Sequence, residues 1–333
     1  MDKILSVTII GLGDIGMLYD YNIDKKWIRL THLKSFNLNK KFDVLNCIDI
    51  SDEKLDLVKK KYGNKINCFN SFTSQIKKTD IYVLSSQSEI NKKYFYEISK
   101  KHDSFFLIEK PCWDINPEEK ISILSKKVYF NYFRKTIPTF KKLKNEFFNG
   151  SHGKIQSLNC YYTKGINNNG SHLIDLIFYF FGSDILLNSI NVNNSINDYN
   201  LNDKTISFSF KLKYKNYLIL VNFIGLDENL YSVIEMDIMA ELNRISIKDF
   251  GNKIIYEEVG EDRLFKGYKK HINTRTYNSK ISMYGDFLAN HVYDIFFEKI
   301  KNDSNFNHQI IISKFIRLIN EYETKRTSNI RRG

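Results

Sequence analysis

The sequence predicts an α/β protein of two domains, the first built on a parallel sheet and the second an α+β domain with a mostly antiparallel open sheet. The 333 residues suffice for two domains at about 150 residues each. Up to residue 130, short apolar runs alternate with helical patterns, which is typical of a parallel sheet covered on both faces. From residue 131, strand-like runs follow one another, as in a sheet with one solvated face. We therefore expect domains at 1–130 and 131–333.

Short runs rich in β-branched residues predict the strands of the first domain, and helical spacing predicts the helices between them. The expected strands are 4–10, 44–48, 81–84, 105–108 and 128–132, and the expected helices are 55–62 and 90–99. Another helix is expected to begin at Pro117, with Asn116 as its N-cap.

In the second domain, residues 138–148 and 173–181 read as helices, and two more helices close the chain at 283–299 and 307–322. The expected strands are 155–162, 186–192, 205–214, 217–225, 232–239, 244–247 and 254–257. Lys215-Asn216 is a hairpin-sized turn, and the Asn-rich stretch 193–202 also reads as turns.

Composition excludes several classes of protein. Hydrophobic residues make up 42% of the chain and aromatic residues 14%, which is ample for a buried core and excludes intrinsic disorder. No run of 18 apolar residues is present, so we expect no membrane partner. The N-terminus leads straight into a strand-like run without a secretion signal, so we expect a cytoplasmic protein.

The net charge of +12 suits anionic partners, yet the lysines are spread over the whole chain and form no stripe with aromatic residues. We therefore do not expect a nucleic-acid partner. The four cysteines form no Cys-x-x-Cys pair and match no zinc spacing, so we expect reduced structural thiols and no metal site.

The segment Gly11-Leu12-Gly13-Asp14-Ile15-Gly16 directly follows a predicted strand. In a dinucleotide-binding turn, the first glycine permits the tight bend, the second lets the backbone approach a pyrophosphate, and the third allows close helix packing. We expect a helix to begin here and to direct its N–H groups at the anion. The alternative is an ordinary glycine turn.

Asp49 ends the second predicted strand, where an acidic residue of this fold binds the ribose 2′-hydroxyl and repels a 2′-phosphate. This favours NAD over NADP. The separation from Gly16 is 33 residues, longer than the usual ~20, and a long loop and helix at 18–39 would absorb the excess. Alternatively, Asp49 is a turn residue, and the nearby Asp52 an N-cap.

Glu109-Lys110-Pro111 stands at the end of another strand, on the sheet edge where ligands bind in open α/β folds. A lysine there can bond the nicotinamide ribose and a substrate hydroxyl, and can stabilise a developing alkoxide. The alternative is a solvated charge.

Gly170-Ser171-His172-Leu173-Ile174-Asp175 opens an apolar helix of the second domain. His172 and Asp175 are three residues apart and so share a helix face, where the carboxylate can orient the imidazole and raise its basicity. The pair suits a general base, although a structural histidine is the plainer alternative.

Together these segments resemble the glucose–fructose oxidoreductase / inositol dehydrogenase / MocA family, along essentially the whole chain. The resemblance rests on the glycine motif, on Glu109-Lys110-Pro111 and on 165–175, with Asn131-Tyr132-Phe133-Arg134 and Pro138 as lesser markers. It implies a Rossmann domain followed by a domain whose open sheet carries the substrate site and often the oligomer interface. A homo-dimer or homo-tetramer is therefore expected.

The resemblance also implies roles for individual residues. Lys110 and His172 would be catalytic. The other implied contacts fall into two groups: for the substrate Arg134, Lys164, Asn168 and Asp175; for the cofactor Gly11, Gly13, Asp14, Ile15, Gly16, Asp49, Ser85, Ser86, Glu109 and Lys110. The sequence departs from the family at Asn168, where members carry Asp, and at Asn91, in place of a histidine that follows a Thr-Pro pair.

The resemblance implies an NAD(H)-dependent oxidoreductase that transfers a hydride between the nicotinamide and a secondary alcohol or ketone of a sugar. Arg134, Lys164 and the basic charge favour a nucleotide-activated or phosphorylated sugar, as in polysaccharide sugar biosynthesis. Three alternatives stay open: a reductase of an imine or unstable intermediate, a non-catalytic NAD-binding regulator, and nucleic-acid binding by the basic C-terminal tail.

Overall fold

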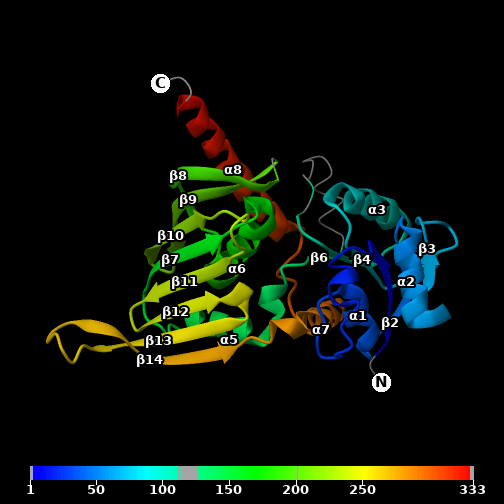
Figure 1. Cartoon of the computed structure of the whole chain (residues 1–333), viewed down its shortest axis with the longest axis horizontal. Coiled ribbons are helices and arrows are strands. Elements are labelled where there is room, and N and C mark those ends of the chain that lie inside the picture. The colour runs from blue at the N-terminus through cyan, green and yellow to red at the C-terminus, as the bar shows by residue number, and fades with distance from the viewer. Residues whose placement is uncertain (1–2, 112, 114–126, 201, 331–333) are drawn as a thin grey trace. The chain divides into compact units, whose positions relative to one another are not determined.

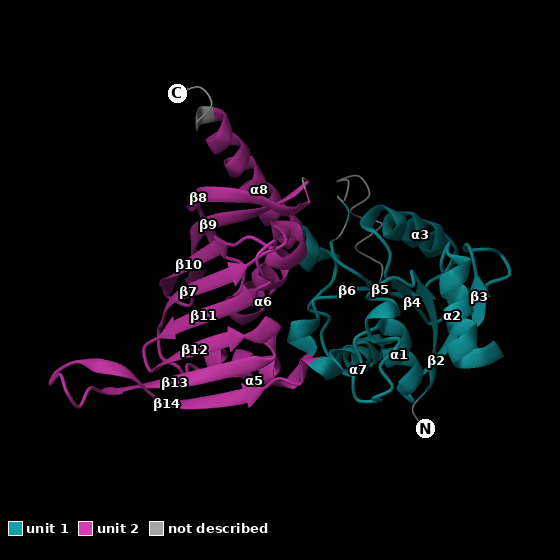
Figure 2. Ribbon diagram, in the orientation of Figure 1, with its two compact units in different colours: residues 1–136, 282–310 teal, residues 137–281, 311–333 magenta. Residues whose placement is uncertain are grey.

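The computed structural model describes residues 3–111, 113, 127–200 and 202–330. The chain forms two compact units (Figure 2). Unit 1 consists of Met1–Thr136 and Ser282–Ile310, and unit 2 of Ile137–Ile281 and Ile311–Gly333. The expected domains were continuous in sequence, 1–130 and 131–333. In the structure, unit 1 also contains the late segment Ser282–Ile310, which interrupts unit 2.

Unit 1 is built on a six-stranded parallel sheet with the strand order β3-β2-β1-β4-β5-β6 (Figure 1). Its strands are β1 Leu5–Ile10, β2 Phe42–Ile48, β3 Asn67–Phe69, β4 Ile81–Leu84, β5 Phe105–Ile108 and β6 Val128–Phe130. This order is that of dinucleotide-binding Rossmann sheets, with the reversal of strand order between β1 and β4. The predicted parallel sheet is confirmed.

Successive side chains of each strand point to opposite faces of the sheet, and helices pack on both faces. One face of β1 packs with α1 (His32–Leu38), α2 (Asp52–Tyr62) and α7 (Tyr284–Phe296) in a single apolar cluster. On β5, Leu107 belongs to that cluster, so the neighbouring Phe106 points to the opposite face. There it meets Phe95 of α3 (Ser88–Lys101), with 5.0 Å between the ring centroids.

The packing of helix α7 explains why a late segment of the chain belongs to unit 1. Its apolar residues Leu288, Ala289 and Val292 are at most 1% exposed and lie in the same cluster as the β1 side chains. Moreover, the Tyr293 hydroxyl donates to the carbonyl of Lys3. The apolar face of α7 was visible in the sequence, but the sheet that it covers was not.

The segment after the glycine turn differs from the prediction, because no α-helix begins at the glycines. One helical turn, in which Met17 N donates to Gly13 O at 2.8 Å, leads instead into a loop that ends at α1. Asp20, 1% exposed, holds this loop by accepting bonds from Leu30 N (2.7 Å) and the Thr31 hydroxyl (2.6 Å). The extra residues between Gly16 and Asp49 are therefore accommodated as a braced loop plus α1.

Unit 2 is built on an eight-stranded sheet with the order β14-β13-β12-β11-β7-β10-β9-β8. Its strands are β7 Ile155–Tyr162, β8 Ile185–Asn200, β9 Asp203–Tyr214, β10 Tyr217–Gly225, β11 Ile234–Ala240, β12 Asn243–Lys248, β13 Lys253–Glu261 and β14 Lys269–Asn278. Only β7 and β10 pair in parallel among the described strands of this sheet, which confirms the mostly antiparallel prediction.

One face of this sheet is covered by α5 (Pro138–Phe148), α6 (Ser171–Phe181) and the later part of α8 (Phe306–Ile330). Phe147 of α5 contacts Phe181 of α6, at 4.8 Å between ring centroids. Phe315 of α8 contacts both Phe178 of α6 and Phe210 of β9. This aromatic layer holds α6, the helix that carries His172, against the sheet.

Several predicted elements differ from the structure. The stretch 193–202, expected as turns, belongs to β8 up to Asn200, and the charged strand β14 and the short β3 were missed. Ser51, not Asp52, caps α2. The helix expected at Pro117 lies outside the described residues. Within the described ranges, no helix is long and apolar enough to cross a membrane.

We predict that Leu288→Ala lowers the free energy of unfolding of unit 1 by about 2–5 kcal/mol, because it opens a cavity between α7 and the sheet. Both tryptophans, Trp27 and Trp113, belong to unit 1, so urea unfolding followed by tryptophan fluorescence reports on this unit. Ile50→Ala is the control, since Ile50 is 87% exposed. Equal unfolding midpoints for the two variants would contradict the assignment of α7 to the core of unit 1.

Candidate functional site

The glycine loop of unit 1 turns tightly against the end of β4. Gly11 has φ = 94°, a backbone conformation that favours glycine, and a Cβ there would lie 2.7 Å from the backbone of Ser85 and Ser86. Gly11 N donates to Ile48 O at 2.8 Å, and the Ser85 hydroxyl donates to Gly11 O at 2.8 Å. The loop is thus fastened to the ends of both neighbouring strands.

The other two glycines differ in what surrounds them. A Cβ at Gly16 would overlap the carbonyl oxygen of Gly11, so this glycine is required by the fold of the loop itself. A Cβ at Gly13 would meet no described atom within 4 Å, and the following Asp14 is exposed and Ile15 half-buried. Gly13 therefore offers bare backbone on the open side of the loop, where a ligand can approach it closely.

Asp49 follows β2 directly and lies beside the glycine loop. It is 9% exposed, and its carboxylate accepts bonds from Leu12 N at 2.7 Å and from Ser51 N at 3.0 Å. Lys54 lies 3.5 Å from the same carboxylate. Asp49 thus braces the loop, a role that the sequence did not indicate, and its contact with a ribose stays a prediction.

Ser86 is held by Asn91, a residue at which the sequence departs from the family that it resembles. The Asn91 side chain accepts from Ser86 N at 3.0 Å and donates to Ser86 O at 2.9 Å, and it is 1% exposed. The two bonds fix the backbone after β4 from both sides. Asn91 therefore has a structural task of its own, and Ser85 and Ser86 stand at the end of β4 as predicted.

Glu109, at the end of β5, belongs to a buried polar cluster that the sequence did not reveal. Its carboxylate accepts a bond from the Asn131 side chain at 2.5 Å and lies 2.7 Å from His32 Nε2. His32, in the first turn of α1, is 3% exposed, and its backbone N donates to Ile15 O in the glycine loop. His32 thus links the glycine loop to Glu109. The next residue, Lys110, is half-buried.

These residues share one edge of the unit 1 sheet. The glycine loop follows β1, Asp49 follows β2, Ser85 follows β4 and Glu109 follows β5. In open parallel sheets, ligands bind beyond the carboxyl ends of the strands, at the reversal of strand order, which here lies between β1 and β4. The sequence-predicted cofactor residues are therefore brought together where a dinucleotide would bind.

The candidate substrate residues of unit 2 lie on one irregular turn and the helix after it. A π-helix, Gly165–Gly170, runs directly into α6. His172 and Asp175 are in the first turns of α6 and are 9% and 1% exposed. Their buried positions on α6 fit an imidazole held in place beside a carboxylate. Asn168, in the π-helix, is half-buried.

Lys164 precedes the π-helix in the left-handed conformation, with φ = 67° and ψ = 40°. Its backbone N donates to Asp198 at 2.9 Å, and its ammonium lies 4.6 Å from the centre of the Tyr199 ring. Lys164 is half-buried and Tyr199 is 58% exposed, so part of this pair faces solvent. Neither Asp198 nor Tyr199 was among the predicted site residues, because the contact joins β7 to β8 through space.

Arg134, predicted as a substrate contact, belongs to unit 1 and is only 4% exposed. It lies in a short 3₁₀ helix, Phe133–Thr136, with its guanidinium 4.8 Å from the centre of the Phe133 ring. Arg134 is about as buried as His172 and Asp175, and its contact with a substrate stays a prediction.

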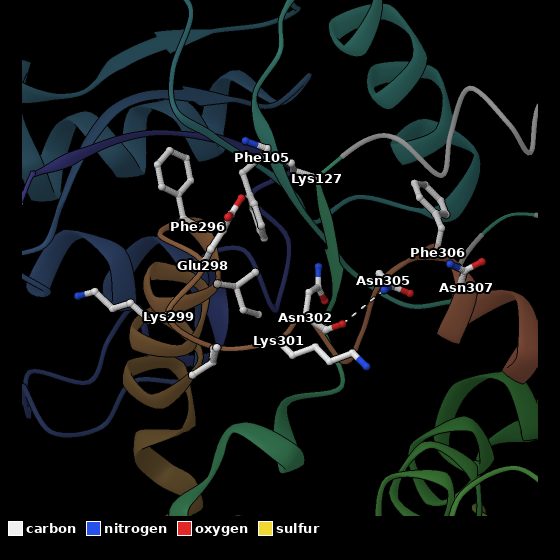
Figure 3. Close-up of a pocket in the computed structure, with 12 residues that line it drawn as sticks. Phe105, Lys127, Phe296, Glu298, Lys299, Lys301, Asn302, Asn305, Phe306 and Asn307 are labelled. Carbon is white, nitrogen blue, oxygen red and sulfur yellow. Dashed lines mark hydrogen bonds between the residues drawn. The ribbon is translucent and has the colours of Figure 1, made fainter.

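A cavity of about 580 Å³ lies at a different place in unit 1 (Figure 3). It is lined by Phe105 and Lys127, at the beginnings of β5 and β6, and by residues of the 295–307 segment. Because strand beginnings and strand ends lie at opposite edges of a parallel sheet, this cavity is remote from the glycine loop. In the described part of the chain, no group of acidic, histidine or cysteine side chains is arranged to hold a metal ion.

Comparison with known proteins shows the fold. No protein-family model and no curated protein matches the sequence. Solved structures do match. A dehydrogenase (MviM) from Clostridium difficile is 19% identical, with a TM-score of 0.68 over 96% of this chain and 99% of that one. The WlbA dehydrogenase from Bordetella pertussis, in complex with NADH and UDP-GlcNAcA, is 12% identical, with a TM-score of 0.72 over 98% and 97%.

A scyllo-inositol dehydrogenase from Lactobacillus casei is 14% identical, with a TM-score of 0.66 over 97% of this chain and 96% of that one. These matches extend over both units, so the likeness is not limited to the Rossmann sheet. The chain therefore has the two-part fold of these dehydrogenases.

We predict that Gly16→Ala and Gly13→Ala affect stability differently. The Gly16 variant forces a methyl group onto Gly11 O and should lower the melting temperature by several degrees, whereas the Gly13 variant has room and should melt like wild type. Differential scanning fluorimetry without ligand checks both. Equal melting temperatures for the two variants would show that the loop does not pack as described.

Proposed function

We propose that the protein is an NAD(H)-dependent oxidoreductase that transfers a hydride between the nicotinamide and a secondary alcohol or ketone of a sugar. The observation that carries this proposal is the sheet edge of unit 1, where the glycine loop, Asp49 and Glu109-Lys110 gather at the reversal of strand order. The open backbone at Gly13 suits a pyrophosphate, and a dinucleotide is the ligand that this arrangement fits best.

We propose NAD as the cofactor, with NADP the lesser alternative. Asp49 is held at the loop by the Leu12 N–H, and lone pairs of its carboxylate remain for a ribose hydroxyl. A 2′-phosphate in that place would meet a carboxylate of like charge. Lys54, 3.5 Å from Asp49, offsets part of this repulsion.

In the proposed oxidation, His172 removes the proton of the substrate hydroxyl while Asp175 supports the imidazole. The carbon-bound hydrogen leaves with its electron pair for the nicotinamide, and Lys110 bonds the hydroxyl oxygen as the ketone forms. Reduction runs the same steps backward. Asn168 cannot take a proton, so His172 acts as the only base on this segment and Asn168 as a hydrogen-bonding partner of the sugar.

For the substrate we favour a nucleotide-activated or phosphorylated sugar, of the kind used in polysaccharide sugar biosynthesis. Lys164, stacked on the exposed Tyr199, offers a cation for a phosphate group. The WlbA neighbour was crystallised with UDP-GlcNAcA and another neighbour is an inositol dehydrogenase, so the fold accommodates sugar-like ligands. Lys164 and Arg134 are the two candidates for binding the anionic group.

We further propose that the protein works in the cytoplasm as a homo-dimer or homo-tetramer. One face of the unit 2 sheet carries a network of opposite charges, with Arg244 bonded to Asp237 and Glu257 and Lys248 bonded to Glu235. Charges of both signs in strips can complement a second copy of the same face. Free Cys47 and Cys160, both buried, suit a reducing compartment.

The test is NADH absorbance at 340 nm, with NAD and a panel of nucleotide sugars, sugar phosphates, free sugars and inositols. We expect turnover with one class, and a loss of about 100-fold or more in kcat for both His172→Ala and Lys110→Ala. His271→Ala and Lys213→Ala are matched controls, because both side chains are exposed on strands of unit 2. They should leave turnover unchanged.

A protein that binds NADH but turns over nothing in the panel would contradict the alcohol-dehydrogenase proposal. Ketone and imine substrates with NADH then separate the remaining possibilities. A reductase of an imine does not need a hydroxyl base, so its activity would survive His172→Asn. Tight NADH binding without any turnover would indicate a regulator instead.

We predict that Asp49→Asn weakens NAD binding by about 10-fold or more and reduces the preference for NAD over NADP. The charged bond to the ribose is lost, and such bonds contribute about 1.5–3 kcal/mol. Titration of intrinsic fluorescence with each cofactor measures both effects. Asp52→Asn, at the exposed start of α2, is the control. An unchanged affinity ratio in the Asp49 variant would exclude the ribose contact.

A further inference from the structure

We infer that the β8–β9 clamp, formed by Asp198, Asp203 and Thr205, is a set of positioning residues that holds the segment 164–172 in its working conformation. Asp198 is the third residue from the end of β8, and Asp203 and Thr205 begin β9. This inference rests on the proposed function, in which Lys164, Asn168 and His172 contact the substrate. The clamp itself touches no substrate in this proposal.

The clamp satisfies the backbone N–H groups at the start of the turn. A helix leaves its first N–H groups without partners inside the helix. Here Lys164 N donates to Asp198 (2.9 Å), Gly165 N to the Thr205 hydroxyl (2.7 Å), and Asn168 N to Asp203 (3.0 Å). Asp203 also accepts from the backbone N and the side-chain amide of Asn167, at 2.8 and 3.0 Å. The N–H groups of four residues of the segment therefore depend on the clamp.

The conformation that the clamp holds is one that the segment would not adopt unaided. Lys164 is a non-glycine residue in the left-handed region, and π-helical turns are rare. At Gly165, φ is 82°, and a Cβ would overlap the carboxylate of Asp203. Strained backbone of this kind persists only where the surroundings determine it, and it gathers at functional sites. The hydrogen bonds of the clamp hold this strained backbone in place.

Burial and charge make the clamp strong. Asp198 is 6% exposed, and its second oxygen accepts the Thr205 hydroxyl at 2.8 Å. Hydrogen bonds to a carboxylate are stronger than those between neutral groups. A carboxylate at a helix N-terminus is also favoured by the positive end of the helix dipole. The N–H groups at that end are therefore already bonded within the protein, and the Lys164 ammonium is the group that we propose for an anionic substrate.

The clamp stands on a rigid base. Ile196 pairs with Thr205 and Asn200 with Asp203 in the β8–β9 ladder. The buried Tyr162 hydroxyl bonds both the N–H and the carbonyl of Ile206, at 2.8 and 2.7 Å. The backbone beside the clamp is thus fixed to the centre of the sheet. A shift of about 1 Å in a residue that positions a reacting group can reduce a rate about 100-fold, so this fixation matters for His172.

The experiment compares Asp203→Asn with a matched control, Asp227→Asn. Asp227 also accepts a backbone N and a side-chain amide, both from Asn229 at 2.9 Å, but in an exposed turn of unit 2. Amide hydrogen exchange is measured by mass spectrometry on peptides covering 164–172, NADH affinity by fluorescence, and kcat and KM on the best substrate of the panel. Thr205→Val and Thr205→Ser form a second pair.

We expect exchange in 164–172 to accelerate at least 10-fold in Asp203→Asn, because the NH2 group that replaces one carboxylate oxygen faces N–H donors and cannot accept from them. We expect kcat to fall about 100-fold with NADH affinity unchanged, since the cofactor residues belong to unit 1. Asp227→Asn should match wild type in all three measurements. Thr205→Ser keeps the hydroxyl and should retain activity that Thr205→Val loses.

The inference is overturned if Asp203→Asn exchanges and turns over like Asp227→Asn, or if Thr205→Val equals Thr205→Ser. A wild-type protein that is silent with every substrate refutes the proposed function rather than the clamp. Amide exchange then decides on the clamp alone, because it needs no substrate. If Asp203→Asn does not fold, the threonine pair carries the same comparison.

Discussion

The turns that carry the candidate site residues depend on buried or half-buried carboxylates that accept backbone N–H groups. A buried N–H without a partner costs about as much as a lost hydrogen bond, so an irregular turn needs an acceptor from elsewhere in the chain. Asp49 serves the glycine loop through Leu12 N, and Asp20 serves the loop before α1 through Leu30 N. Asp198 and Asp203 serve the π-helix of unit 2 in the same way.

This constraint separates two kinds of residue at the candidate sites. Gly13, Lys164 and His172 are those that we propose to meet a ligand, and each stands on a backbone fixed by others. Gly16, Asn91 and Asp203 do the fixing, through steric fit or hydrogen bonds within the protein. Asp49 belongs to both kinds. The need for acceptors explains why acidic residues recur at these turns despite the net positive charge of the chain.

How much the sequence revealed follows from the range of the interactions involved. Alternation placed β7 and β10 correctly, and the glycine motif marked the loop, because both are local patterns. The helix expected after Gly16 failed, because a braced loop there is decided by Asp20 and Thr31. Strand β14 was missed since its charged residues are exposed beside β13. The partners His32–Glu109 and Asp203–Asn168 are remote in sequence, so no spacing could indicate them.

The division of unit 1 has a consequence for how the chain matures on the ribosome. Leu288 and Val292 complete an apolar cluster whose first members are Leu5 and Val7. By the time α7 emerges, all strands of unit 2 have already been synthesised. Unit 2 can therefore pair its strands early, but the later part of α8, which covers its sheet, is synthesised only after α7. Both units thus need the C-terminal part of the chain before their cores are complete.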